Sequence, residues 1–228
     1  MSRCNFSTSH IGLELERSGI AIISENNFTM CNCGLRMFAS GDSNIINNYF
    51  NTISSNVVFN DTNVTTLNGI GLLLTASTGN TNVIGGKVEY CNKGIVVNSS
   101  MGVNINAVQF DWNKSGNLFF VTSSYAINGT IMGSNVTGCR FLGTPAKQHI
   151  YIRYWNVSKV NICGNFFTKN ASDVAAVDTS TGANEGPEYI MTIVQKQDGD
   201  DYRKPITINF KGNSIYRCTN LADIILTS

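Results

Sequence analysis

Two carboxylates, Glu89 and Asp111, recur at one position of a repeated pattern. Each lies six residues after an apolar residue, Val83 in the first copy and Ile105 in the second. Paired carboxylates are the groups that a glycosidase uses, one as the general acid and the other as the base or nucleophile. Because two adjacent carboxylates repel each other, the pKa of one is raised, which suits that group to act as an acid. We therefore interpret Glu89 and Asp111 as a candidate catalytic pair.

Aromatic, cationic and amide residues accompany this pair. Tyr90 and Trp112 directly follow the two carboxylates, where they could stack on a sugar ring. Lys87 and Gln109 precede the carboxylates by two residues, which puts them on the same side of a strand. Arg140 takes the equivalent position in the next copy of the pattern. We interpret these five as candidate substrate-binding residues.

Two other interpretations of this patch stay open. In the first, Lys87–Glu89 and Arg140–Asp111 are surface ion pairs that balance stacked charge, and the two aromatic side chains point into the core. In the second, the patch binds a sugar but does not cleave it. Which interpretation holds depends on the elements that position these side chains.

The positioning elements follow from a repeat. An apolar residue is followed five positions later by Phe or another apolar residue, in the pairs Ile23/Phe28, Ile45/Phe50, Val83/Val88, Ile105/Phe110, Val136/Phe141, Ile162/Phe167 and Phe210/Ile215. A weaker copy begins at Val64, with Gly69 in the second position, and Phe6 belongs to a partial first copy. The residue before the apolar anchor is asparagine in seven copies of eight: Asn44, Asn63, Asn82, Asn104, Asn135, Asn161 and Asn209.

Units this short cannot bury their own apolar side, so they must stack. The runs are short and rich in Ile, Val, Thr and Phe, and they lack a helical period. Each strand then pairs with its equivalent about 4.8 Å away. The phenylalanines form an internal column, and the asparagines form a hydrogen-bonded ladder. We predict an all-β parallel solenoid of about eight to nine coils, a single domain over residues 1–228, with loop excursions near 121–133 and 169–205.

Composition excludes several classes of protein. The 228 residues carry a net charge of +1, which argues against binding to nucleic acid. No apolar run approaches the roughly 20 residues of a transmembrane helix, so no membrane insertion is expected. Several of the seven cysteines recur at fixed positions in non-adjacent copies, which favours small buried residues over metal ligands or disulfides. Of the two histidines, His149 is expected at a coil edge. We predict no metal and no cofactor.

The pattern Asn-Ile/Val-x-x-x-x-Phe, followed by runs such as Gly94-Ile95-Val96-Val97, resembles the right-handed parallel β-helix of the pectate-lyase-like superfamily. Its irregular coils resemble the central domains of bacteriophage tailspikes and depolymerases. This resemblance implies a homotrimer on the phage tail, folded in the bacterial cytoplasm, that binds a capsule or O-antigen polysaccharide outside the host. Both ends of the chain fall inside a coil, so we expect a module of a longer protein.

Three functions follow as expectations. The first is hydrolysis of a bacterial surface polysaccharide by Glu89 and Asp111, or with a partner acid from the 169–205 loop if the site lies between subunits. The second is a polysaccharide lyase, in which Arg140 or Lys87 lies near a uronate. The third is a non-catalytic adhesin or structural spike segment.

Overall fold

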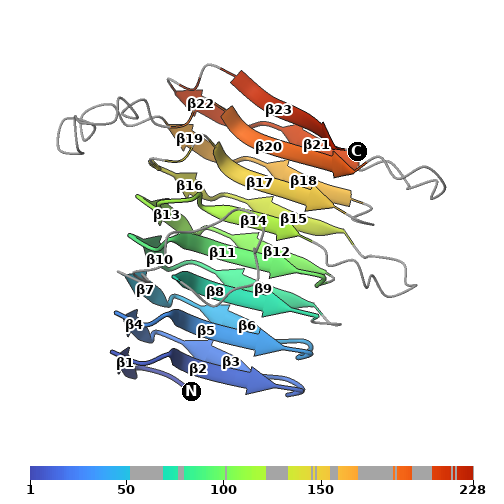
Figure 1. Cartoon of the computed structure of the whole chain (residues 1–228). Coiled ribbons are helices and arrows are strands. Elements are labelled where there is room, and N and C mark those ends of the chain that lie inside the picture. Colours follow the sequence, from blue (N-terminus) through green and yellow to red (C-terminus); the bar gives the residue numbers. More distant parts are fainter. Residues whose placement is uncertain are drawn as a thin grey trace.

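The computed structural model describes residues 1–51, 69–76, 80–100, 102–121, 133–144, 146, 148–154, 159–168, 187, 189–196, 207–216, 218 and 220–227. In these ranges the chain winds through three parallel sheets that rise together along one axis (Figure 1). Two of the sheets have eight described strands and the third has seven. No helix long and apolar enough to cross a membrane occurs in this part of the chain.

The sheets are named here by their first strands. The β1 sheet contains β1 (Asn5–Ser7), β4 (Asn27–Thr29), β7 (Tyr49–Asn51), β10 (Lys87–Glu89), β13 (Gln109–Asp111), β16 (Arg140–Phe141), β19 (Phe166–Thr168) and β22 (Ser214–Tyr216). The β2 sheet contains β2 (Ile11–Glu16), β5 (Cys33–Phe38), β8 (Ile70–Thr75), β11 (Lys93–Asn98), β14 (Leu118–Val121), β17 (Gln148–Tyr154), β20 (Tyr189–Lys196) and β23 (Asn220–Thr227). The β3 sheet contains β3 (Ile22–Ser24), β6 (Asn44–Ile46), β9 (Thr81–Ile84), β12 (Val103–Asn106), β15 (Ser134–Thr137), β18 (Lys159–Cys163) and β21 (Thr207–Lys211).

Each strand pairs in parallel with its equivalent one coil away, which confirms the predicted all-β parallel β-helix. The internal aromatic column is confirmed as well. Phe6, Phe28 and Phe50 stack with ring centroids 4.8 Å apart. Phe141 stacks between Phe110 and Phe167, at 4.8 Å and 4.6 Å. The ring spacing matches the spacing of the strands, so each coil sets the height of the next.

The asparagine ladder runs along the outer side of the β3 sheet. Asn82 donates its side-chain N–H to the Oδ1 of Asn44, and Asn104 donates in turn to Asn82, both at 3.0 Å. Asn135 and Asn161 continue the ladder at 2.7 Å per bond. Each amide therefore fixes the register of the next coil, as the sequence predicted.

The ladder also corrects the number of copies. Because Asn82 bonds directly to Asn44 and β9 pairs with β6, no copy of the repeat intervenes between them. The copy predicted to begin at Val64 is therefore wrong as a coil of its own. Its asparagine, Asn63, lies outside the described residues, and Gly69 precedes β8 in the same coil as Asn44. Gly69 holds the position of Asn32 and Asn92, just before the strands of the β2 sheet, so its match to the second apolar position was a coincidence of spacing.

The predicted excursions fall mostly outside the described residues. In the first, residues 122–132 are not described. In the second, residues 169–186 and 197–206 are not described, but β20 lies between them and pairs with β17 and β23. The interval 169–205 is thus divided by a strand of the β2 sheet.

His149 occupies the interior of the coil and not its edge, contrary to the prediction. Its side chain is fully buried, its Nδ1 lies 2.8 Å from Nδ2 of Asn117, and its ring contacts Phe141 and Phe167. Burial lowers the pKa of His149 to about 3. The residue follows Asn117 in a column that holds Gly34, Gly71 and Gly94 in earlier coils, where a Cβ at Gly34 or Gly71 would meet interior side chains.

No disulfide joins any of the seven cysteines, all of which lie within the described ranges. Cys31, Cys91 and Cys139 are buried in the core, as expected of small interior residues. Burial raises the pKa of the Cys139 thiol to about 11 and that of Cys33 to about 12. A thiol with so high a pKa is a poor nucleophile at neutral pH.

Candidate functional site

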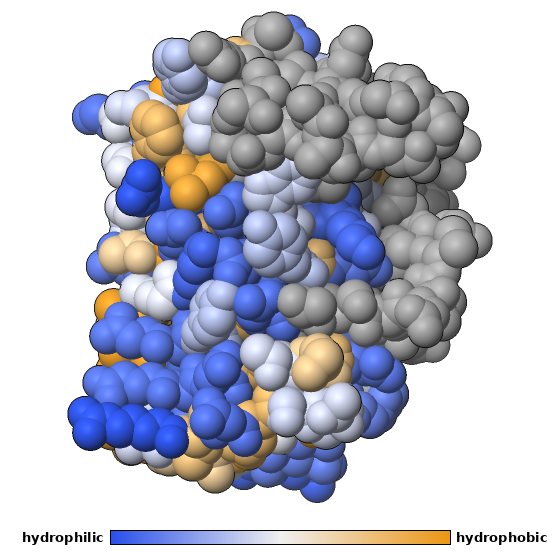
Figure 2. All heavy atoms as spheres, turned by 90° about the vertical axis from the view of Figure 1, so that its left-hand side faces the viewer, coloured by the Kyte–Doolittle hydropathy of each residue, from blue (hydrophilic) through white to orange (hydrophobic). Residues whose placement is uncertain are grey.

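The register of the β1 sheet assembles the predicted patch. Lys87 pairs with Gln109, and Gln109 pairs with Arg140, in three consecutive coils. Glu89 lies directly opposite Asp111. Since the residues between them, such as Val88, point into the core, these polar side chains lie together on the outer face of the sheet. This side of the molecule is mostly hydrophilic where it is described (Figure 2).

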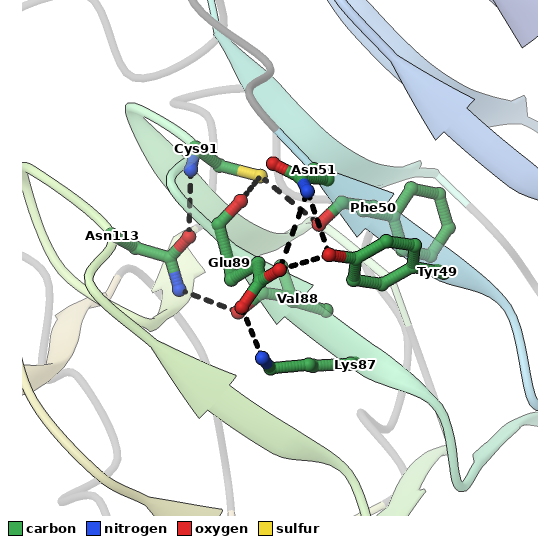
Figure 3. A network of polar contacts seen from close by, with 8 residues as sticks. All are labelled: Tyr49, Phe50, Asn51, Lys87, Val88, Glu89, Cys91 and Asn113. Atoms are coloured by element: carbon green, nitrogen blue, oxygen red, sulfur yellow. Dashed lines mark hydrogen bonds and ion pairs between the residues drawn. The ribbon is translucent and has the colours of Figure 1, made fainter.

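Glu89 is the centre of a polar network that the sequence did not reveal in full (Figure 3). Only 5% of Glu89 is exposed, although it lies on an outer face. One carboxylate oxygen accepts hydrogen bonds from the Tyr49 hydroxyl and from Asn51 Nδ2, the latter at 3.3 Å. The other oxygen forms an ion pair with Lys87 Nζ. Three donors, from Tyr49, Asn51 and Lys87, therefore converge on this carboxylate.

Tyr49 and Asn51 come from β7, the strand below β10. Asn51 Nδ2 also donates to the Tyr49 hydroxyl at 2.6 Å, so the two side chains hold each other in place. Burial and the hydrogen bond to Glu89 raise the pKa of Tyr49 to about 12. The phenol is therefore protonated at neutral pH and donates to the carboxylate.

Both residues were missed because of the false copy at Val64. That copy placed another coil between Ile45 and Val83, whereas the two coils are neighbours. Counted from the anchor, Tyr49 holds the position of Lys87, and Asn51 holds the position of Glu89. A comparison of the strong copies alone would have found them.

The buried side chain of Asn113 holds the turn that follows Glu89. Asn113 accepts a hydrogen bond from the backbone N–H of Cys91 at 3.0 Å and donates to the carbonyl of Val88 at 3.1 Å. The Cys91 thiol lies 3.5 Å from the carbonyl of Glu89. The backbone on both sides of the carboxylate is thus held from inside the coil, which limits its movement.

The two aromatic candidates lie at the turn that leaves the β1 sheet. Tyr90 has φ of 53° and Trp112 has φ of 51°, a left-handed conformation that Thr8 and Met30 also adopt after β1 and β4. Tyr90 is 50% exposed and Trp112 is half-buried. Neither belongs to the core, so the interpretation that put them there is wrong.

The remaining candidates differ in their surroundings. Arg140 is exposed, whereas Gln109 and Asp111 are half-buried. The Lys87–Glu89 ion pair does form, as the interpretation of the patch as surface ion pairs predicted. It differs from an ordinary surface pair because its carboxylate is buried and has two further donors, a combination that often marks functional sites.

No protein-family model matches the chain, and no curated protein matches it. Among solved structures, the chain is similar to an alginate lyase from Paenibacillus sp. str. FPU-7, with 13% sequence identity and a TM-score of 0.52. The match covers 98% of this chain and 80% of that one. At this identity the likeness concerns the fold and not the activity. The chain has a parallel β-helix fold, as its repeats indicated.

Proposed function

We propose that this protein binds an acidic polysaccharide on the outer face of the β1 sheet and cleaves it by β-elimination. The observation that carries the proposal is the buried contact between Tyr49 and Glu89, with Lys87 on the other carboxylate oxygen. A hydroxyl on an ionised carboxylate is a pair through which a proton can pass. The fold shared with an alginate lyase supports the proposal as an analogy.

Elimination needs a cationic or amide surface that neutralises the carboxylate of a uronic acid. Lys87, Gln109 and Arg140 form such a row on consecutive strands, about 4.8 Å apart. Bound there, the uronate loses negative charge, so the proton on the adjacent carbon becomes more acidic. This stabilisation acts on charge that develops in the transition state.

The Tyr49–Glu89 pair then moves the proton. The phenolic oxygen takes the proton of the carbon beside the carboxylate as its own proton passes to Glu89. The electrons of the broken C–H bond form a C=C bond, and the bond to the glycosidic oxygen breaks. The pair returns one proton to the leaving oxygen, so the enzyme ends in its starting state and no water is consumed.

Hydrolysis is the second candidate, because Glu89 and Asp111 lie opposite each other as predicted. Neighbouring strands about 4.8 Å apart can place two carboxyl groups at the separations found in retaining or inverting glycosidases. Against it, three donors already engage both carboxylate oxygens of Glu89, the atoms that a general acid would turn toward the leaving oxygen.

A panel of polysaccharides separates these functions. The protein is incubated with sodium alginate, polygalacturonate, and capsular and O-antigen preparations, while viscosity, ultraviolet-absorbing unsaturated ends and reducing ends are followed. Elimination predicts unsaturated ends and little effect of Asp111→Asn. Reducing ends without unsaturation, lost in Asp111→Asn, would establish hydrolysis instead. Binding without any fall in viscosity would establish the adhesin.

The tailspike-like setting stays a prediction. It comprises a bacterial surface polysaccharide as ligand, a homotrimer, and a place on the phage tail. Sedimentation equilibrium tests the trimer, and a fall in viscosity of only the capsular or O-antigen samples in the panel would support a bacterial surface ligand.

A further inference from the structure

Two exposed aromatic side chains continue the columns of the candidate site toward the C-terminal end of the solenoid. Phe166 pairs with Arg140, so it extends the column of Lys87 and Gln109 by one further coil. Tyr216, one coil beyond, pairs with Thr168. Phe166 is 36% exposed and Tyr216 is 53% exposed.

Strand alternation fixes the direction of these side chains. Phe167 and Ile215 occupy the inward column, so Phe166 and Tyr216, their neighbours in sequence, point to the outer face. This is the face that carries Glu89. Single exposed apolar residues are common, but these two continue the columns of the candidate site, which places them where a sugar ring can stack.

The spacing sets the geometry of a ligand. Phe166 lies three strands beyond Lys87, about 14 Å along the axis at about 4.8 Å per strand. Between them the face presents Gln109 and Arg140. A chain of sugars has polar edges for the amide and the cation and apolar ring faces for an aromatic side chain.

We propose that Phe166, together with Tyr216, is a distal sugar-stacking subsite for a polysaccharide that runs parallel to the solenoid axis. The inference rests on the proposed function, since it assumes that the ligand occupies the β1 sheet. The subsite contributes only when the sugar chain is long enough to reach from the Tyr49–Glu89 pair to Phe166. It therefore sets a dependence on chain length and plays no part in proton transfer.

The test measures binding and cleavage of uronic-acid oligosaccharides, from disaccharide to octasaccharide. They are prepared from the polysaccharide of the panel that the protein cleaves fastest or, if it cleaves none, from alginate. In Phe166→Ala we expect affinity for the longest oligosaccharides to fall about tenfold, the loss of one stacking contact of about 1.4 kcal/mol. Disaccharide binding and kcat should not change. Phe166→Trp should restore the affinity, whereas Phe166→Leu, which keeps an apolar side chain, should not.

Ile84→Ala is the matched control, because Ile84 is 38% exposed but lies on the outer face of the β3 sheet. If Phe166→Ala lowered the affinity equally for oligosaccharides of every length, or for none of them, the proposed subsite would be wrong. Length-dependent loss of binding in a protein that cleaves nothing would uphold the subsite and refute the proposed elimination.

Discussion

Neighbouring residues of the same strands have opposite surroundings in the β1 sheet. On β10 and β13, Val88 and Phe110 point into the apolar core, while Glu89 and Asp111 lie on the outer face of the sheet. The inward column holds Val88 on one strand and Phe110 on the next, so it requires only an apolar side chain that fills the interior of the coil. The outward column carries particular chemical groups on particular coils. We therefore expect stability to depend on the inward residues and the proposed activity on the outward residues, one position apart along each strand, and the predictions below test that separation.

The largest effect is expected in the inward column. Phe110→Ala removes a ring that stacks on Phe141, and we expect the free energy of unfolding to fall by about 3–5 kcal/mol. Asp111→Ala, one residue further along, should change it by less than about 1 kcal/mol. Urea denaturation of the two variants measures both values. Similar losses would contradict the separation of the two columns.

The reverse is expected for activity. Glu89→Gln keeps the size of the side chain but removes the proton acceptor, so kcat should fall by about 100-fold or more. Val88→Ala should reduce stability but leave kcat unchanged at a temperature where the variant is folded. Activity assays are paired with thermal melts of each variant. If kcat is retained in Glu89→Gln, Glu89 does not take part in the proton transfer.

His149 extends the comparison to pH. Burial lowers its pKa from an ordinary value of 6.5 to about 3, so the unfolded chain binds a proton that the folded chain excludes. The stabilisation is complete above about pH 6.5 and is lost as the pH falls toward 3, by up to about 1.4 kcal/mol per pH unit. Unfolding measured across this range should show a shallower pH dependence in His149→Gln than in wild type. Parallel curves would mean that His149 does not contribute.

The smallest effect is expected in the asparagine ladder. Asn104→Ala leaves the Oδ1 of Asn82 and the amide of Asn135 without their ladder partner, at a cost of about 1–2 kcal/mol. Asn106→Ala, on the same strand but exposed, should change stability by less than about 0.5 kcal/mol. Equal values from denaturation would show that the ladder adds no stability.

The inward column was predictable because every coil must fill its interior with apolar side chains. A coil of fixed size needs one large apolar residue at a fixed position, so Ile105 and Phe110 were recognisable without a structure. The ladder was predictable as well, because asparagines at one repeated position lie one strand spacing apart and their side-chain amides can bond from coil to coil. At Val64 and Gly69 only the spacing matched, without a large apolar second residue, and the copy counted there is not a coil of its own.

The outward column was only partly predictable. Glu89 and Asp111 were placed correctly because their coils are adjacent in sequence and strongly patterned. Tyr49 was missed because 38 residues separate its anchor Ile45 from Val83, although the two coils are in contact. The burial of His149 follows from its neighbours Phe141 and Phe167, which the sequence of its own strand does not specify.

The central claim is that the Tyr49–Glu89 pair on the β1 sheet cleaves an acidic polysaccharide by elimination. The most direct measurement is the rate at which unsaturated sugar ends appear, by ultraviolet absorbance, in wild type, Tyr49→Phe and Tyr151→Phe. Tyr151 lies on the β2 sheet and serves as the control. We predict that Tyr49→Phe loses at least about 100-fold in rate and that Tyr151→Phe retains the wild-type rate. A Tyr49→Phe protein that forms unsaturated ends as fast as wild type would contradict the claim.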